Sequence, residues 1–107
     1  MDSELVEAAI SQAELCALFG YSKRILILWA LAYREMTVGE IAQAIETSIQ
    51  STSHHLRLMR DRGVVWSERE GAFVRYRLVE DHSVGCLLMN IKNHPTLARS
   101  DVDPFKA

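Results

Sequence analysis

The chain has 107 residues, of which 49% are hydrophobic and 24% are charged, and its formal net charge at pH 7 is −2. This length gives one domain without room for a large substrate cavity and a lid, and this composition predicts a folded chain. The longest apolar run, residues 25–33, is far shorter than the roughly 20 residues of a membrane span, and the first residues lack the basic start of a signal peptide. Because two cysteines make no disulfide framework, we expect a cytoplasmic protein with reduced thiols and no membrane partner.

The net charge hides an uneven distribution along the chain. Residues 54–79 contain six arginines and three acidic residues, whereas residues 1–53 contain three basic and seven acidic residues. An arginine-rich segment in an otherwise acidic chain indicates a surface for an anion or a nucleic acid. The alternative from charge alone is a solvated face.

The first predicted element is a helix over residues 3–19, which Ser3 can cap and Gly20 ends. Its polar residues share one narrow face, and apolar residues fill most of the remaining circumference. An ordinary surface helix has an apolar stripe only somewhat wider than about 100°. We therefore expect this helix to pack against its own domain and also against a second subunit, through the face around Leu5, Ala9, Cys16 and Phe19.

The next segments predict three more helices. Ser22 can cap a helix over residues 23–34, which is apolar nearly all round and should be the central buried helix. Thr37 and Glu40 have the spacing of a capping box that opens a short helix over residues 38–45. After a turn, a helix over residues 49–62 stops at Gly63, and its inward face consists of Ile49, Thr52, Leu56 and Met59.

The pattern then takes the period of a strand. Residues 64–69 and 72–78 flank Glu70-Gly71, which predicts a β-hairpin. A last helix should begin at Asp81 or Ser83 and end before Pro95. The predicted fold is mainly α with a small β-hairpin (α+β), in one domain over residues 1–94, followed by a flexible tail over residues 95–107.

Two short helices joined by a tight turn and followed by a basic hairpin describe a winged helix-turn-helix. The second short helix should enter the major groove of double-stranded DNA, which is wide enough for an α-helix. Short polar side chains suit base edges, and arginine suits guanine or phosphate. The residues expected to face bases are Gln50, Ser51, Ser53, His54 and Arg57, and those expected to contact phosphate or the minor groove are Arg60, Arg69, Arg75 and Arg77.

Over about residues 12–92 the chain resembles the ArsR/SmtB family of winged-helix repressors. The stretches that carry the resemblance are residues 22–28 (SKRILIL), 37–42 (TVGEIA), 53–65 (SHHLRLMRDRGVV) and the hairpin over 69–78. The resemblance implies a homodimeric repressor whose first and last helices form the interface and which releases its operator when a metal or an oxidant binds. Ile49 and Gln50 depart from the family pattern, so we expect a different operator.

The family's metal sites are incomplete in this sequence. Residues 37–39 are Thr-Val-Gly where one type of member has a Cys-x-Cys thiolate site. Of the zinc-type ligands on the last helix, Asp81 and His94 are present, but Ser83 and Leu97 occupy the other two positions. Because a closed zinc site needs four donors, we expect weak zinc binding at most. The alternative is that Asp81 caps the helix and His94 interacts with the helix dipole.

The two cysteines offer a second kind of sensor. If the first and last helices meet across the dimer, Cys16 and Cys86 could bind a thiophilic metal or metalloid ion or form a regulated disulfide. A disulfide requires a Cα separation below about 7 Å. The alternative is inert packing, which is common for free cysteines.

Other function classes find less support. The sequence has no Gly-rich phosphate loop and no His-Glu-x-x-His motif, and the adjacent His54 and His55 point about 100° apart on a helix, so we expect no enzyme. The alternative function is a winged-helix module for protein–protein contact without specific DNA binding. The reading face lacks the aromatic anchor that protein interfaces favour, which argues against this alternative.

Overall fold

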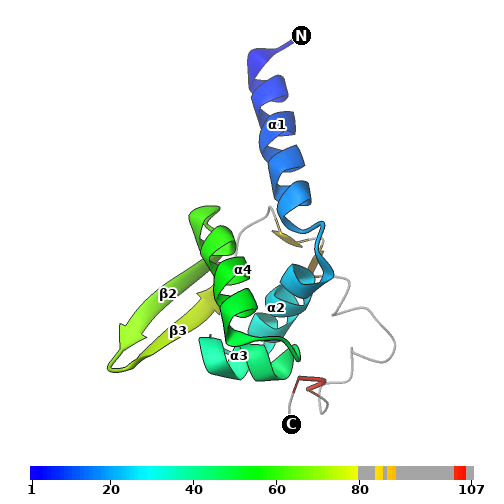
Figure 1. Ribbon diagram of the computed structural model, residues 1–107. Helices are drawn as coiled ribbons and strands as arrows, with labels where there is room; N and C mark the ends of the chain where they lie inside the picture. The colour runs from blue at the N-terminus through cyan, green and yellow to red at the C-terminus, as the bar shows by residue number, and fades with distance from the viewer. Residues whose placement is uncertain (80–83, 86, 89–102, 106–107) are drawn as a thin grey trace.

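The computed structural model describes residues 1–79, 84–85, 87–88 and 103–105 (Figure 1). The helices α2, α3 and α4 form the body, the β2–β3 hairpin projects beside α4, and α1 stands away from the body (Figure 1). The predicted mainly α fold with a hairpin is confirmed. In chain order the elements are α1 (Ser3–Leu18), α2 (Ser22–Tyr33), β1 (Met36–Thr37), α3 (Val38–Ala44), α4 (Ile49–Asp61), β2 (Val65–Glu70) and β3 (Phe73–Leu78).

Helix α2 lies at the centre of the core, as predicted. Its Ile27 and Leu28 are fully buried, together with Ile41 of α3 and with Leu56 and Met59 of α4. Apolar burial of this kind contributes about 25 cal/mol per Å² of surface removed from water. The same packing therefore stabilises the fold and fixes α3 and α4 against α2 and directly against one another.

The two-residue strand β1 was not predicted. It pairs antiparallel with β3, with Met36 opposite Tyr76 and Thr37 opposite Arg75, and the sheet order is β1-β3-β2. Thr37 is also the N-cap of α3, where the predicted capping box is confirmed: Glu40 N donates to Thr37 Oγ1 at 3.3 Å, and Thr37 N donates to Glu40 Oε1 at 2.9 Å. One residue therefore joins the hairpin to the start of α3.

Two predicted helix caps and one predicted core residue are wrong. Asp2 rather than Ser3 caps α1, with its carboxylate accepting from Glu4 N at 2.9 Å, and Tyr21 rather than Ser22 precedes α2 without a side-chain cap. The sequence pattern predicts Ile49 on the inward face of α4, but its side chain is 61% exposed. Ile49 is the first residue of the helix, and the buried residues of α4 begin at Thr52.

The end of α4 and the hairpin turn both depend on glycine. Gly63 ends α4 at a φ of 75°, as the predicted stop requires, and Val64 N donates to Met59 O at 2.9 Å to close the cap. The hairpin turn occupies Gly71 and Ala72, one residue later than predicted, because Glu70 pairs with Phe73. Gly71 has a φ of 61°, a backbone conformation that glycine adopts without steric cost.

The described part of the C-terminal region packs on α2. The Trp29 indole Nε1 donates to the Leu87 carbonyl at 2.9 Å, and the rings of Tyr33 and Phe105 make an edge contact at 5.9 Å. Most of the predicted last helix and of the 95–107 tail lies outside the described residues. No single helix in the described ranges is long and apolar enough to cross a membrane; α1 and α2 pass that test only together, across a 94° bend.

We predict that Gly63→Ala lowers the free energy of unfolding by about 1 kcal/mol or more, because alanine at a φ of 75° is strained. Gly39→Ala is the matched control. Gly39 lies in α3 with open space around its Cα, so alanine there should leave stability unchanged or raise it. Urea unfolding of both variants measures the difference, and equal effects would contradict the assigned role of Gly63.

Candidate nucleic-acid interface

Helix α4 separates a buried face from a polar outer face. Ser48 caps its start, with its hydroxyl accepting from Ser51 N at 3.0 Å, and Thr52 is buried with its own hydroxyl donating to the Ser48 carbonyl at 2.8 Å. The residues of α4 that are predicted to contact DNA lie on the outer side of the helix, which we call the reading face. Of these, Gln50, His54, Arg57 and Arg60 are exposed, and Ser51 and Ser53 are half-buried.

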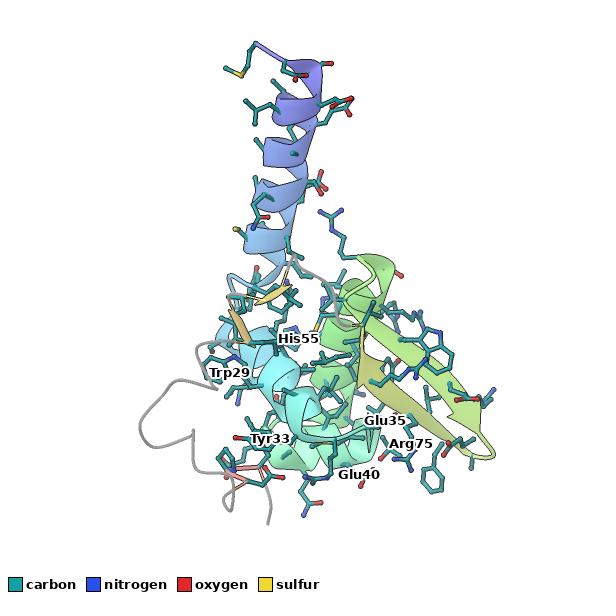
Figure 2. The ribbon with its side chains drawn as sticks, turned by 180° about the vertical axis from the view of Figure 1, so that it is seen from behind. Trp29, Tyr33, Glu35, Glu40, His55 and Arg75 are labelled. Carbon is teal, nitrogen blue, oxygen red and sulfur yellow. The ribbon has the colours of Figure 1, made fainter. Side chains whose placement is uncertain are left out.

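The β2–β3 hairpin is the wing of this fold, and three of its arginines, Arg69, Arg75 and Arg77, are predicted to contact DNA. These three side chains have different surroundings. Arg75 Nε donates to the Glu70 carboxylate at 3.0 Å, and Glu40 and Glu35 also lie close enough to act on its charge (Figure 2). The hydrogen bond and the charge of Glu70 raise the pKa of Arg75 above its ordinary value, and Glu40 and Glu35 add to this effect. Arg75 is therefore surrounded by carboxylates of its own chain.

Arg77 and Arg69 differ from Arg75. The Arg77 guanidinium lies 4.2 Å from the centre of the Trp66 ring, its partner across the hairpin, in a cation–π contact. Arg69 is exposed opposite Val74 and makes no ion pair within the part of the chain that the structure describes. Of the three, Arg69 has neither an ion pair nor a cation–π contact in the part of the wing that the structure describes.

Helix α1 exposes most of its apolar side chains. Leu5 is 61% exposed and Ile10 is 54% exposed, and Leu18 is the one buried residue of this helix. Phe19, expected on the same outer face, instead lies in the core of its own domain at 5% exposure, because the chain turns there towards α2. A contiguous apolar face of this kind marks an interaction surface.

The predicted sensor residues are only partly described. Cys16 is exposed on α1, where Gln12 Nε2 lies 3.8 Å from its sulfur. Cys86, Asp81 and His94 lie outside the described residues. In the ranges that are described, no three His, Cys, Asp or Glu side chains are grouped as a metal site would require.

Sequence reasoning did not assign a role to Arg24, which lies at the start of α2 beside α4. Arg24 is 7% exposed; its Nε donates to His55 Nδ1 at 3.0 Å and its Nη1 donates to the Leu18 carbonyl at 3.0 Å. Its guanidinium also lies 4.2 Å from the centre of the Tyr21 ring. The available signal was a lone arginine preceding the apolar run at residues 25–33, but its partners come from distant parts of the sequence.

His55 faces away from the reading surface, towards the corner where α1 meets the body (Figure 2). Burial lowers the pKa of His55 below its ordinary value of 6.5, and the nearby charges of Arg24 and His54 lower it further. At neutral pH this imidazole is therefore uncharged, which is the state that accepts a hydrogen bond at Nδ1.

Comparisons with known proteins agree with this architecture. Residues 21–67 match the family described as bacterial regulatory protein, arsR family. The transcriptional regulator YgaV of Escherichia coli is 30% identical over 85% of this chain and 92% of its own length. The transcriptional regulator KmtR of Mycobacterium tuberculosis is 35% identical over 64% of this chain, which spans 53% of KmtR.

A solved structure shows the same fold. The homodimeric winged helix-turn-helix DNA-binding domain Mb0332 of Mycobacterium bovis superposes with a TM-score of 0.72 at 22% identity, over 83% of this chain and 82% of that one. The expected fold is therefore confirmed as a winged helix-turn-helix. The extent of the match to YgaV, together with the family match over α2, α3 and α4, shows that the chain belongs to the ArsR family of bacterial regulatory proteins.

Proposed function

We propose that the protein is a homodimeric transcriptional repressor that binds a two-fold operator in double-stranded DNA. The observation that carries this proposal is the outer face of α4, where Gln50, His54 and Arg57 are exposed at helical spacing while the inner face is buried. Such a helix presents donors, acceptors and a cation to the major groove without disturbing the core.

Each predicted contact has a role in this proposal that its exposure and charge support. Base contacts come from Gln50, Ser51, Ser53 and His54, and Arg57 binds guanine or phosphate. Arg60 and Arg69 bind backbone phosphate, because both are exposed. Arg75 and Arg77 reach the DNA by exchanging Glu70 and Trp66 for phosphate, so each contributes less than an arginine without an internal partner.

The exposed face of α1 supports the dimer. Leu5, Val6 and Ile10 together leave apolar surface in water that a second copy of the helix would cover. A dimer also supplies the two recognition helices that a two-fold operator needs.

A protein–protein module is the second candidate, favoured by two aromatic side chains on the wing. Trp66 and Phe73 are both exposed, and aromatic residues are frequent anchors of protein interfaces. The dependence of binding on salt concentration distinguishes the two functions, because DNA binding weakens steeply as the salt concentration rises.

We predict that Arg57→Ala weakens operator binding by about 1–3 kcal/mol, because it removes a contact to a base or phosphate. Arg34→Ala is the charge-matched control: Arg34 follows the end of α2, outside both α4 and the hairpin, and pairs with Asp103. Fluorescence anisotropy over a range of salt concentrations measures both. Equal losses in the two variants would place the reading surface elsewhere, and salt-independent binding would favour the protein–protein module.

We predict that Ile10→Asp converts the dimer to a monomer at micromolar concentration, because it places an unpaired charge in the covered face of α1. Ser11→Asp introduces the same charge at the next position, on the polar face, and should remain dimeric. Sedimentation velocity distinguishes the two outcomes. A wild-type monomer under the same conditions would refute the dimer and weaken the case for a two-fold operator.

We propose the thiols, rather than the residual zinc ligands, as the switch that releases DNA. A thiolate is both a ligand for soft ions and the nucleophile of oxidation, whereas Ser83 and Leu97 supply no strong zinc donor. We expect arsenite or peroxide to release the operator from the wild type and not from the double variant Cys16→Ser, Cys86→Ser. Release from the double variant would refute the thiol switch, and a response of the wild type to zinc alone would reverse the ranking.

A further inference from the structure

Arg24 joins three elements at one buried point. It belongs to α2, its Nη1 binds the Leu18 carbonyl in the last turn of α1, and its Nε binds the imidazole of His55 in α4. Among the described residues its partners carry no full negative charge: they are a helix C-terminal carbonyl, a nitrogen lone pair and the face of the Tyr21 ring. A buried guanidinium held by neutral groups depends on each of them, because an unmet donor or charge in the interior is costly.

The hydrogen bond from Arg24 sets the state of His55. Because Arg24 has only donors, His55 Nδ1 must carry a lone pair, and the proton of the neutral ring lies on Nε2. Protonation of His55 replaces the acceptor with a second donor and brings two cations into contact at 3.0 Å. The contact therefore exists only while His55 is uncharged.

The charges around His55 oppose its protonation. Arg24 faces it from α2, and His54 faces it from α4 with ring centres 6.0 Å apart. The carboxylates of Glu14 on α1 and Asp61 on α4 line the hollow beside Arg24, and Glu14 is paired with Arg62. No carboxylate among the described residues pairs with His55 itself.

The position of this contact connects the two surfaces of the proposed function. Helix α1 carries the exposed apolar face of the proposed dimer. His54 and Arg57, which come before and after His55 in the sequence of α4, lie on the reading face of that helix. In the proposed dimer, a displacement of α4 relative to α1 would change the separation and orientation of the two copies of α4, which are the recognition helices. Half-site spacing on DNA tolerates little change, because it is fixed by the helical repeat.

We propose that Arg24 is a positioning residue for operator recognition: through neutral His55 it holds α4 against the α1–α2 corner, and protonation of His55 releases α4. The inference rests on the proposed function as a DNA-binding dimer. It makes operator affinity dependent on pH through a side chain that does not face the DNA.

The sign of the pH dependence follows from the lowered pKa. A histidine whose folded pKa is below 6.5 contributes fully to the stability of the folded state above pH 6.5, and the contribution falls as the pH drops towards the folded pKa.

The experiment measures affinity for a DNA duplex selected by the wild-type protein from a random-sequence pool at about pH 7.5, where histidine is neutral. Binding is followed at constant salt down to about pH 5.5, where an ordinary histidine is charged. The test variant is His55→Asn, whose side-chain oxygen takes the place of Nδ1 as acceptor and does not titrate. The other three of the four histidines are common to both proteins, so the difference between the two profiles belongs to His55.

We expect the wild type to lose about five- to tenfold more affinity than His55→Asn over this range, as for loss of one ordinary intramolecular hydrogen bond. At neutral pH, His55→Asn should bind nearly as tightly as the wild type, whereas His55→Leu and Arg24→Lys should bind more weakly. Lysine keeps the charge of Arg24 but lacks the planar fork that reaches Leu18 and His55 together. Circular dichroism confirms that each variant is folded.

A nitrogen NMR titration of His55 in the free dimer tests the contact without DNA. The expected result is an unprotonated Nδ1 at neutral pH and a pKa below 6.5 in the wild type. Identical pH profiles for the wild type and His55→Asn, or a protonated Nδ1, overturn this inference and leave the proposed function as a DNA-binding dimer unaffected. Failure to enrich any duplex overturns the proposed function and this inference with it.

Discussion

The arrangement of the domain depends on the burial of α2. Ile27 and Leu28 are inaccessible to water, and the inner residues of α4, above all Leu56 and Met59, pack in the same core. Helix α4 has only this narrow apolar stripe, so a helix of 13 residues with so many polar side chains would be marginal by itself. Its conformation is therefore supplied by the core, and its outer face is left free to carry polar and charged groups.

Carboxylates close to the hairpin arginines reduce the basic surface that this chain of net charge −2 presents. Several of its acidic residues lie among the arginines: Glu70 pairs with Arg75, and Glu40 and Glu35 lie near the same side chain (Figure 2). Glu40 is held ionised by its hydrogen bond to the Thr37 backbone, which lowers its pKa. This internal compensation leaves Arg57, Arg60 and Arg69 as the arginines for which non-specific attraction to DNA is strongest, and it lowers the number of phosphates that the wing can neutralise.

Features with local causes could be predicted from the sequence. The capping box of Thr37 and Glu40 needs only a spacing of three residues, and the stop at Gly63 needs only a residue that accepts a positive φ. The exposed positions on α4 followed from helical periodicity in the same way. Strand β1 could not be predicted, because two residues show no alternation and its pairing partner lies about forty positions away.

Features with distant causes were missed or misplaced. The amphipathic pattern of the first helix predicts Phe19 on its outer face, but the helix ends at Leu18 and the turn that follows directs Phe19 into the core. Ile49 reads as a core residue, although α4 contacts the core only from Thr52 onwards. The role of Arg24 required three elements to be placed at once, since Leu18 and His55 are separated from it by 6 and 31 positions.

The attachment of α1 connects assembly to DNA recognition. With a single buried residue over 16 positions, α1 is fixed to its own domain mainly at its base, by Leu18 itself, by the bond from Arg24 to the Leu18 carbonyl and by the ion pair of Glu14 with Arg62. A helix attached at one end takes its direction from whatever covers its exposed face, which in the proposed dimer is the second subunit. Two of the attachments lead to α4 or its C-cap, through His55 and through Arg62. In the proposed dimer, a change in how two copies of α1 pack would therefore be transmitted first to the recognition helices, and a ligand or oxidant acting at that interface would need no contact with DNA to alter operator affinity.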